Sequence, residues 1–115
     1  MQLTSKQIQR YSRQLILKKI GPIGQKKLIK SKVLIVGVGG LGSPVSIYLA
    51  GMGIGNIGII DADVVDISNL HRQILFETKD IKKSKSKLAS QKIKKINPDI
   101  NVSYFSKKLT KNNIN

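Results

Sequence analysis

The residue types best suited to chemistry fall along the chain in an order that matches the parts of a nucleoside triphosphate. A glycine-rich stretch comes first, with the pattern G-x-G-G-x-G over residues 37–42. Asp61 follows 19 residues after Gly42, where a carboxylate can accept hydrogen bonds from ribose hydroxyls. Arg13 and Arg72 lie on either side of these elements and can neutralise charge that develops on phosphorus. Together these groups predict a site for nucleotidyl transfer.

Each glycine of the stretch has a separate mechanical use. Gly37 permits a tight turn after a strand, and Gly39 lets the backbone approach a phosphate. Gly42 lets the following helix pack closely on the strand, and Gly40 widens the approach to the phosphate. The helix that opens here points free N–H groups at an anion. The stretch therefore predicts nucleotide binding.

The residues after Asp61 separate two classes of nucleotide enzyme. A nicotinamide-dependent oxidoreductase carries out its chemistry at a ring held by the second half of the sheet, and it needs no cationic group directly after the ribose acid. This chain has Asn69, Arg72 and then Lys85, which suit a triphosphate. The pattern favours a transferase, and an oxidoreductase fragment remains the alternative.

Residues 33–60 contain no charged side chain and are long enough to be considered as a membrane span. Eight glycines and Pro44 argue against a span, because they divide the stretch into short elements. We expect a strand at 33–36, a helix at 44–52 and a strand at 57–60. Both faces of such a sheet are expected to be buried, as in parallel sheets covered by helices.

The flanking segments supply the remaining elements. We expect an opening helix over residues 4–18, capped by Thr4 or Ser5 and ended by Gly21-Pro22, and a second helix over 24–30. The stripe of the opening helix consists of Ile8, Tyr11, Leu15 and Ile16.

A lysine-rich helix is expected over residues 84–95, ended by Asn97-Pro98. Its apolar face consists of Leu88, Ile93 and Ile96. Alternation at Ile100, Val102 and Tyr104 predicts a third strand. The predicted class is α/β: the Rossmann-like half of a doubly wound, mainly parallel sheet of three strands, preceded by N-terminal helices.

The length of 115 residues fits one nucleotide-binding domain. We divide it into N-terminal helices (1–31), a βαβαβ unit (32–105) and a polar tail (106–115). No secretory signal is visible, so we expect a soluble protein of the cytoplasm or plastid stroma, with no membrane partner.

The composition restricts the classes of partner and of site. The formal charge is +15, but the basic residues are almost all lysine, in a chain equally rich in isoleucine. A drift in composition, as in an A+T-rich plastid or endosymbiont genome, explains most of this charge, and we do not expect nucleic acid as a partner. A basic RNA- or protein-binding domain without catalysis stays as an alternative. The chain has no cysteine, which excludes disulfides, cysteine zinc sites and thiol nucleophiles from these residues.

Several motifs, taken together, resemble the ThiF/MoeB/HesA adenylyltransferase family, relatives of ubiquitin-activating enzymes. The resemblance covers about residues 8–105, and its spacing is most similar to the molybdopterin-synthase branch, with the thiamine-pathway branch second. The motifs are Tyr11-Ser12-Arg13-Gln14, residues 33–42, Ile60-Asp61-Ala62-Asp63, Ser68-Asn69-Leu70-His71-Arg72-Gln73, Lys85 and Ile96-Asn97-Pro98.

The resemblance implies activation of a ubiquitin-like sulfur-carrier protein for molybdenum cofactor biosynthesis, with ATP as cosubstrate. Catalytic roles are implied for Arg13, Arg72 and Lys85, with Arg13 reaching into the partner subunit of a homodimer. The implied nucleotide-binding residues are Gly37, Gly39, Gly40, Gly42, Asp61, Asp63, Ser68, Asn69, Leu70, His71, Arg72 and Lys85. Asp63 equally suits a loop cap, and His71 is expected to be a loop contact rather than a base.

The resemblance also implies features that these residues do not contain. Relatives hold magnesium through an aspartate whose position would lie beyond Asn115, and zinc through cysteines. We therefore expect no metal ligands here, and we expect the sequence to be a truncated or partial copy.

Overall fold

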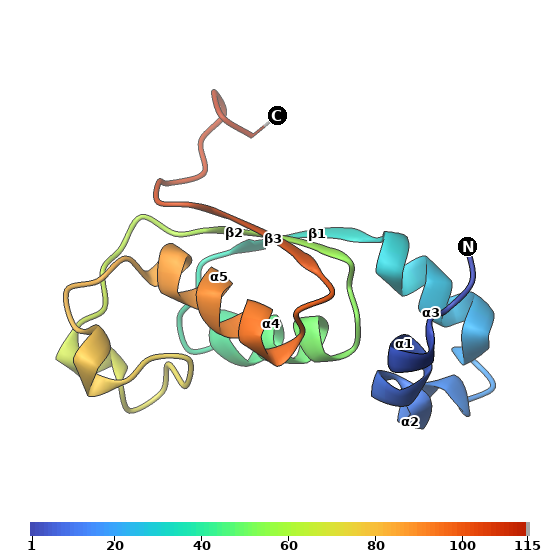
Figure 1. Cartoon of the computed structure of the whole chain (residues 1–115). Coiled ribbons are helices and arrows are strands. Elements are labelled where there is room, and N and C mark those ends of the chain that lie inside the picture. The colour runs from blue at the N-terminus through green and yellow to red at the C-terminus, as the bar shows by residue number, and fades with distance from the viewer. Residues whose placement is uncertain (115) are drawn as a thin grey trace.

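The computed structural model describes residues 1–114 (Figure 1). It has three parallel strands in the order β1-β2-β3. The strands pair in register, with Leu34 opposite Gly58 and Gly58 opposite Ser103. The elements are α1 (Ser5–Arg10), α2 (Ser12–Leu15), α3 (Gly21–Lys30), β1 (Lys32–Val36), α4 (Gly42–Gly51), β2 (Asn56–Ile60), the 3-10 turns η1 (Ile67–Asn69) and η2 (Thr78–Asp80), α5 (Lys85–Ile96) and β3 (Asn101–Phe105). The predicted α/β class with a three-stranded parallel sheet is confirmed.

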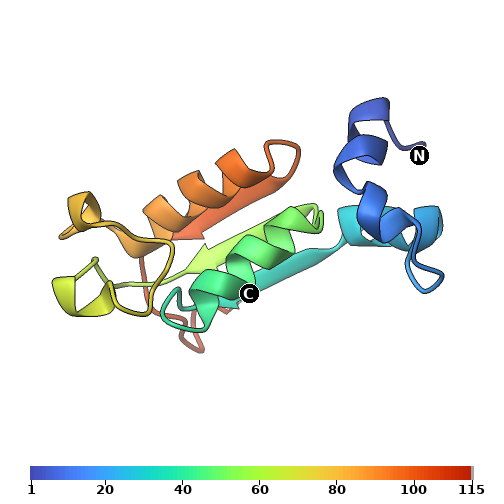
Figure 2. The same cartoon turned by 90° about the horizontal axis from the view of Figure 1, so that it is seen from below.

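Helices α4 and α5 cover one face of the sheet, and the main apolar core lies between them and the strands (Figure 2). Ile57 and Ile59 of β2 point into this core together with Ile93 of α5. Each crossover returns the chain to a parallel neighbouring strand, and the two helices lie on the same side because the strands are added in one direction.

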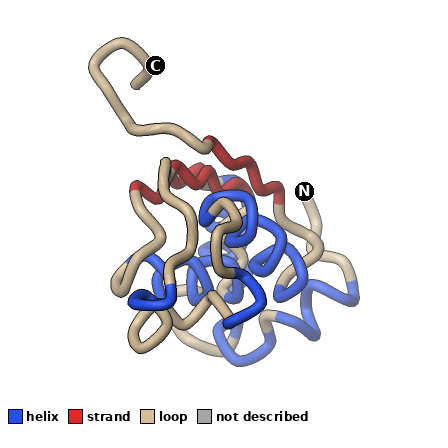
Figure 3. Tube along the Cα trace, turned by 90° about the vertical axis from the view of Figure 1, so that its left-hand side faces the viewer, coloured by secondary structure: helices blue, strands red, loops and turns tan. Residues whose placement is uncertain are grey.

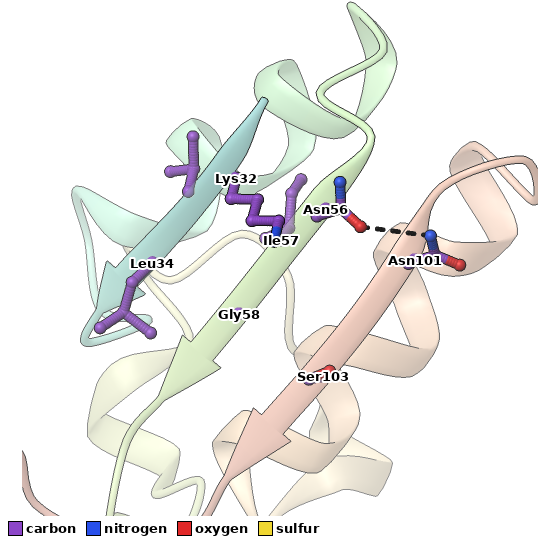
Figure 4. Close-up of a pocket in the computed structure, with 8 residues that line it drawn as sticks. Lys32, Leu34, Asn56, Ile57, Gly58, Asn101 and Ser103 are labelled. Carbon is purple, nitrogen blue, oxygen red and sulfur yellow. Dashed lines mark hydrogen bonds between the residues drawn. The ribbon is translucent and has the colours of Figure 1, made fainter. Parts of the chain in front are cut away.

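The opposite face of the sheet is largely bare, which corrects the expectation that both faces are buried. No helix among residues 1–114 covers it, and Figure 3 shows the helices on one side of the strands. Leu34 is 47% exposed and Val36 is 60% exposed. Close up, Gly58 leaves a shallow hollow between the side chains of Leu34 and Ser103 (Figure 4). Within residues 1–114 the outward apolar side chains of β1 therefore stay uncovered.

The N-terminal segment differs from the single helix expected over residues 4–18. The helix is interrupted at Tyr11, whose φ of −100° and ψ of 13° lie outside the helical region, and this divides it into α1 and α2. The Tyr11 side chain is buried, and its hydroxyl accepts a hydrogen bond from Asn97 Nδ2 at 2.9 Å. The predicted stripe is wrong at two positions, since Ile8 and Ile16 are exposed. Thr4 forms the expected cap, as part of a capping box with Gln7.

Three smaller differences concern helix ends. Gly21 and Pro22 open α3 rather than only ending the preceding helix, as expected for proline in a first turn. Helix α4 begins at Gly42, two residues earlier than predicted. Helix α5 is capped by Ser84 and ends at Ile96, whose side chain is exposed rather than buried. None of the helices in the described part of the chain has the length and apolarity needed to span a membrane.

A buried ion pair holds the η2 turn on α5. Lys92 Nζ lies 2.6 Å from the buried Asp80 carboxylate and also donates to the Leu75 carbonyl. Burial raises the pKa of Asp80, but hydrogen bonds from the Lys92 side chain and the Glu77 N–H, with the charges of Lys92 and Lys83, outweigh it and leave the pKa lowered. Because the folded state binds this proton less tightly, the pair adds stability above pH ~4 and loses it as pH falls further.

We expect Asp80→Asn to unfold at a lower urea concentration than wild type at pH 7. Its free energy of unfolding should be lower by about 1–3 kcal/mol, because the charge pair with Lys92 is lost. The difference from wild type should narrow as the pH falls below about 4, because the unfolded wild-type chain then takes up a proton at Asp80 that the folded state, with its lowered pKa, binds less tightly. Urea titrations at several pH values measure both effects. Glu77→Gln is the matched control: its 3.4 Å pair with Lys79 is exposed, so its effect should stay below about 0.5 kcal/mol.

Candidate functional site

The glycine turn joins the carboxyl end of β1 to the start of α4. Gly37 has φ +88°, a conformation that L side chains rarely adopt. A Cβ added to Gly42 would lie 1.9 Å from the Gly37 carbonyl oxygen, so the chain can fold back on itself only with glycine there. The turn thus places the N-terminus of a ten-residue helix at the edge of the sheet. This position favours an anion.

Asp61 binds the glycine turn to the loop that follows β2. One oxygen of its carboxylate accepts the Val38 N–H at 2.9 Å, and the other accepts the Asp63 N–H at 2.8 Å. Each oxygen keeps a further lone pair for another donor. The carboxylate is therefore fixed in direction and can still accept hydrogen bonds from a ligand.

A hollow of about 340 Å³ opens beside Asp61 at the carboxyl edge of the sheet. The hollow is lined by apolar side chains, by two carboxylates and by lysines of the tail. The lining consists of Val36, Gly37, Ile60, Asp61, Ala62, Asp63, Lys107, Lys108 and Leu109. The hollow therefore offers apolar surface and hydrogen-bonding groups next to the glycine turn.

Arg72 lies directly against the glycine turn. A Cβ added to Gly40 would lie 3.5 Å from Arg72 Cδ, an ordinary van der Waals distance, so the arginine side chain packs against this glycine. The guanidinium donates from Nη1 to the Ser68 carbonyl at 3.1 Å and is otherwise exposed. The Arg72 charge is thus held at the mouth of the turn by its own loop.

Lys85 is the first residue of α5 and is only 6% exposed. Its backbone N–H donates to the Asp63 carbonyl at 3.1 Å, which places it beside the loop after β2. Among the described residues, none accepts a hydrogen bond from its ammonium group. The neighbouring Lys82, Lys83 and Lys87 are exposed. Lys85 is therefore the lysine of this cluster that is set into the fold.

The loop between these cations is ordered by its own caps. The Asp66 carboxylate accepts hydrogen bonds from the Ser68 hydroxyl and the Ser68 N–H. These bonds, together with the charge of Lys85, outweigh the effect of burial and leave the pKa of Asp66 lowered. Asn69 Oδ1 accepts the Asp66 N–H at 2.9 Å, and His71 Nδ1 lies 3.0 Å from the Ser68 carbonyl. The expectation of a loop contact for His71 agrees with this geometry.

The predicted site residues thus fall into two groups. The four glycines, Asp61, Asp63, the loop 68–72 and Lys85 come from neighbouring elements at one edge of the sheet. Arg13 lies apart from them, exposed on α2 among the N-terminal helices, at the far end of the molecule from the η1 and η2 turns (Figure 1). Within one chain the structure does not bring Arg13 to the glycine turn.

Sequence reasoning did not single out two features of this site. Gln73 is buried next to the glycine turn; it belongs to the motif over residues 68–73, but that motif assigned it no role. Lys107, Lys108 and Leu109 of the tail form part of the hollow, which no local pattern indicates. Among the described residues, no group of three or more His, Cys, Asp or Glu side chains is placed to hold a metal ion.

Comparisons with known proteins identify similar sequences over most of the chain. A family model described as the ThiF family matches residues 11–115. The sulfur carrier protein ThiS adenylyltransferase of Escherichia coli is 46% identical over 108 residues, which are 94% of this chain and 43% of that protein. A Porphyra purpurea protein named "Probable molybdopterin-synthase adenylyltransferase" is 55% identical over 100 residues, 87% of this chain and 26% of that protein.

The fold is also similar to a solved structure. The E. coli tRNA N6-threonylcarbamoyladenosine dehydratase TcdA, in complex with ATP, matches with a TM-score of 0.86 and 28% identity, over 98% of this chain and 46% of that one. In each comparison the chain spans less than half the length of the relative.

We expect Gly42→Ala to destabilise the protein by at least about 2 kcal/mol, because its Cβ would overlap the Gly37 carbonyl. Gly51→Ala is the matched control in the same helix. A Cβ there meets nothing within 4 Å, so this change should stabilise by up to about 1 kcal/mol. Urea unfolding of the two variants and wild type measures both effects. Equal stability of the two variants would contradict the role assigned to Gly42.

Proposed function

The chain belongs to the ThiF family, and from this premise we propose that it binds ATP at the glycine turn and takes part in adenylating a ubiquitin-like sulfur-carrier protein. The carrier is of the molybdopterin-synthase small-subunit type. The observation that carries the proposal is the convergence of Gly40, Asp61 and Arg72 on one edge of the sheet. Arg72 contacts the turn that Asp61 holds by a hydrogen bond, so one extended ligand can touch all three.

The nucleotide is arranged by these fixed groups. The phosphates lie on the glycine turn and the N-terminus of α4, and the ribose hydroxyls donate to Asp61. The base lies in the adjoining hollow, against the apolar surface of Val36 and Leu109. Because Arg72 and Lys85 approach from the loop side, the α-phosphate lies between the turn and these two cations.

In the reaction, a carboxylate oxygen of the carrier's C-terminal glycine attacks the α-phosphorus of ATP. The new P–O bond forms as the bond to the β-phosphate breaks, so the products are an acyl-adenylate and pyrophosphate. The attacking carboxylate is already ionised, and no base has to remove a proton. Arg72 and Lys85 stabilise the negative charge that grows on the phosphate oxygens.

The residues described here do not form a complete site for magnesium or zinc, so no step is assigned to a metal. The choice of carrier is supported by the 55% identity to the Porphyra purpurea protein, against 46% for the thiamine-type relative. A carrier of the thiamine pathway is the alternative. The lysine- and isoleucine-rich composition supports a plastid or endosymbiont origin.

Binding of ATP is tested by thermal protection. At a concentration 100-fold above its Kd, ATP should stabilise the protein by about 2.7 kcal/mol, and NAD should give no shift. Lys85→Met should reduce the protection by ATP, because it removes a buried cation next to the site. Lys87→Met is the matched control from the exposed side of the same helix and should keep the protection.

The alternatives give different results in the same assays. Protection by NAD alone would indicate an oxidoreductase fragment, and RNA binding that weakens steeply with salt would indicate a basic RNA-binding domain. Pyrophosphate release with a thiamine-type carrier but not a molybdopterin-synthase carrier would reassign the pathway.

We further propose that Arg13 serves the site of a second copy in a homodimer. Two observations support this: Arg13 lies far from the glycine turn of its own chain, and an apolar stripe lies beside the turn on α4. In this stripe Leu41 is 86% exposed, and Val45 and Tyr48 follow at helical spacing. The N-terminal segment exposes Ile16 and Leu17, between α2 and α3, and Ile23 of α3. A two-fold contact between these surfaces would bury both apolar sets.

The dimer is tested by sedimentation velocity. Wild type should sediment as a dimer, and Tyr48→Lys should shift it to the monomer, because a charge would be buried in the contact. Ile114→Lys is the control, since this exposed residue lies in the tail, outside the proposed contact. A monomeric wild type at micromolar concentration would contradict the proposal.

A further inference from the structure

A buried polar network fastens the N-terminal helices to the C-terminal ends of α4 and α5. Asn97, the cap residue of α5, is fully buried and donates from Nδ2 to the Tyr11 hydroxyl and to the Ala50 carbonyl, both at 2.9 Å. Ala50 belongs to the last turn of α4, and Tyr11 lies between α1 and α2. One amide group thus connects three parts of the chain that are remote in the sequence.

Two glutamines form the second half of this network. Gln14 of α2 donates from Nε2 to the Met52 carbonyl at 2.7 Å and to the side-chain carbonyl of Gln25. Gln25 is fully buried in α3 and donates to the same Met52 carbonyl at 3.1 Å. Met52 caps the end of α4, so both glutamines hold the N-terminal helices against the same point.

Gly53 shows how closely the network is packed. Its φ of +92° favours glycine, and an added Cβ would lie 2.6 Å from Gln25 Nε2 and 2.7 Å from Tyr11 Cζ. A larger side chain would have to displace both the glutamine amide and the tyrosine ring. The close fit therefore restricts how the N-terminal helices can sit on the rest of the fold.

Arg13 lies in the short helix that these contacts hold. Tyr11 precedes it by two residues and Gln14 follows it directly, and both of their side chains turn into the network, while Arg13 is exposed. Helix α2 has only four residues, which is too short to be stable by itself, so its direction depends on its tertiary contacts. The network thus sets where the Arg13 side chain leaves the surface.

We propose that Tyr11 and Gln14 are positioning residues, which hold α2 so that Arg13 reaches the nucleotide site of a second copy. This inference rests on the proposed ATP binding and on the proposed homodimer. Neither residue has to touch the nucleotide, since each acts through Arg13, which supplies the charge. A guanidinium stabilises phosphate oxygens well only when its place is fixed beforehand, and the buried network fixes it from behind the helix.

The test is a double-mutant cycle of Tyr11→Phe and Arg13→Ala. The Kd for ATP is measured by calorimetric titration at protein concentrations at which wild type is dimeric. We expect Arg13→Ala to raise this Kd about tenfold, because a charged contact with the phosphates is lost. Tyr11→Phe should raise it about fivefold in the wild-type background and leave it unchanged when Arg13 is already replaced. Gln14→Leu should show the same dependence on Arg13.

Tyr104→Phe is the matched control, since it removes a hydroxyl from a half-exposed ring on β3, outside the network. It should change neither the Tm nor the Kd for ATP. Tyr11→Phe should lower the Tm in any case, because a buried hydrogen bond is lost, so the Kd decides.

A merely structural role for the network gives a different pattern. Tyr11→Phe and Gln14→Leu would then leave the Kd for ATP unchanged, or raise it equally with and without Arg13, and either result would overturn the inference. If Tyr11→Phe does not fold, Gln14→Leu decides alone, because Gln14 is only partly buried.

Failure of the proposed function gives separate results. Wild-type protein that does not bind ATP would overturn ATP binding, and this inference with it. Wild-type protein that binds ATP with a Kd that Arg13→Ala leaves unchanged would overturn the role of Arg13 in a second copy. A Kd that responds to Arg13→Ala, but to neither Tyr11→Phe nor Gln14→Leu, would overturn only the positioning role.

Discussion

The geometry of this edge of the sheet depends on the Asp61 carboxylate. It holds the glycine turn through Val38 and its own loop through Asp63, so the segments that follow β1 and β2 cannot move independently. The loop then carries Arg72 and Gln73 back against the glycines, and the Asp63 carbonyl accepts the N–H of Lys85. The Asp61 carboxylate thus joins the glycine turn to the start of the loop that carries the cations.

The same residue can serve structure and ligand without conflict. A carboxylate accepts several hydrogen bonds, and only one backbone donor occupies each oxygen of Asp61. The pre-set direction would lower the cost of ordering the group on binding of the proposed nucleotide. The cations follow the same rule, since Arg72 is held by a carbonyl of its own loop and Lys85 is set into the start of α5.

One face of the sheet is covered by helices and the other is bare, and the side chains of each strand divide between the two faces. Inward residues such as Ile57 and Ile59 meet α4 and α5, while Leu34 and Val36 face outward and stay exposed. The apolar outer residues of β1 are typical of a strand covered on both sides. The chain spans less than half the length of the relatives that it matches.

The sequence by itself determined the parallel strands, the glycine turn and the place of Asp61, because these depend on local properties. A positive φ at Gly37 and the absence of a Cβ at Gly42 are demands of a few neighbouring residues, and the type of residue records them. Spacing also identified Lys85 among its neighbours, and the structure shows that it is the buried one. Its role with a nucleotide stays a prediction.

Only the tertiary structure decided where side chains turn toward remote partners. Helical periodicity placed Tyr11 on a stripe with Ile8 and Ile16, but only Tyr11 of these three is buried, where its hydroxyl accepts a hydrogen bond from Asn97, 86 residues away. The burial of Gln73 against Gly39 and the bare outer face of the sheet were equally invisible in the sequence. Periodicity describes one element at a time, whereas burial is set by whichever distant element packs against it.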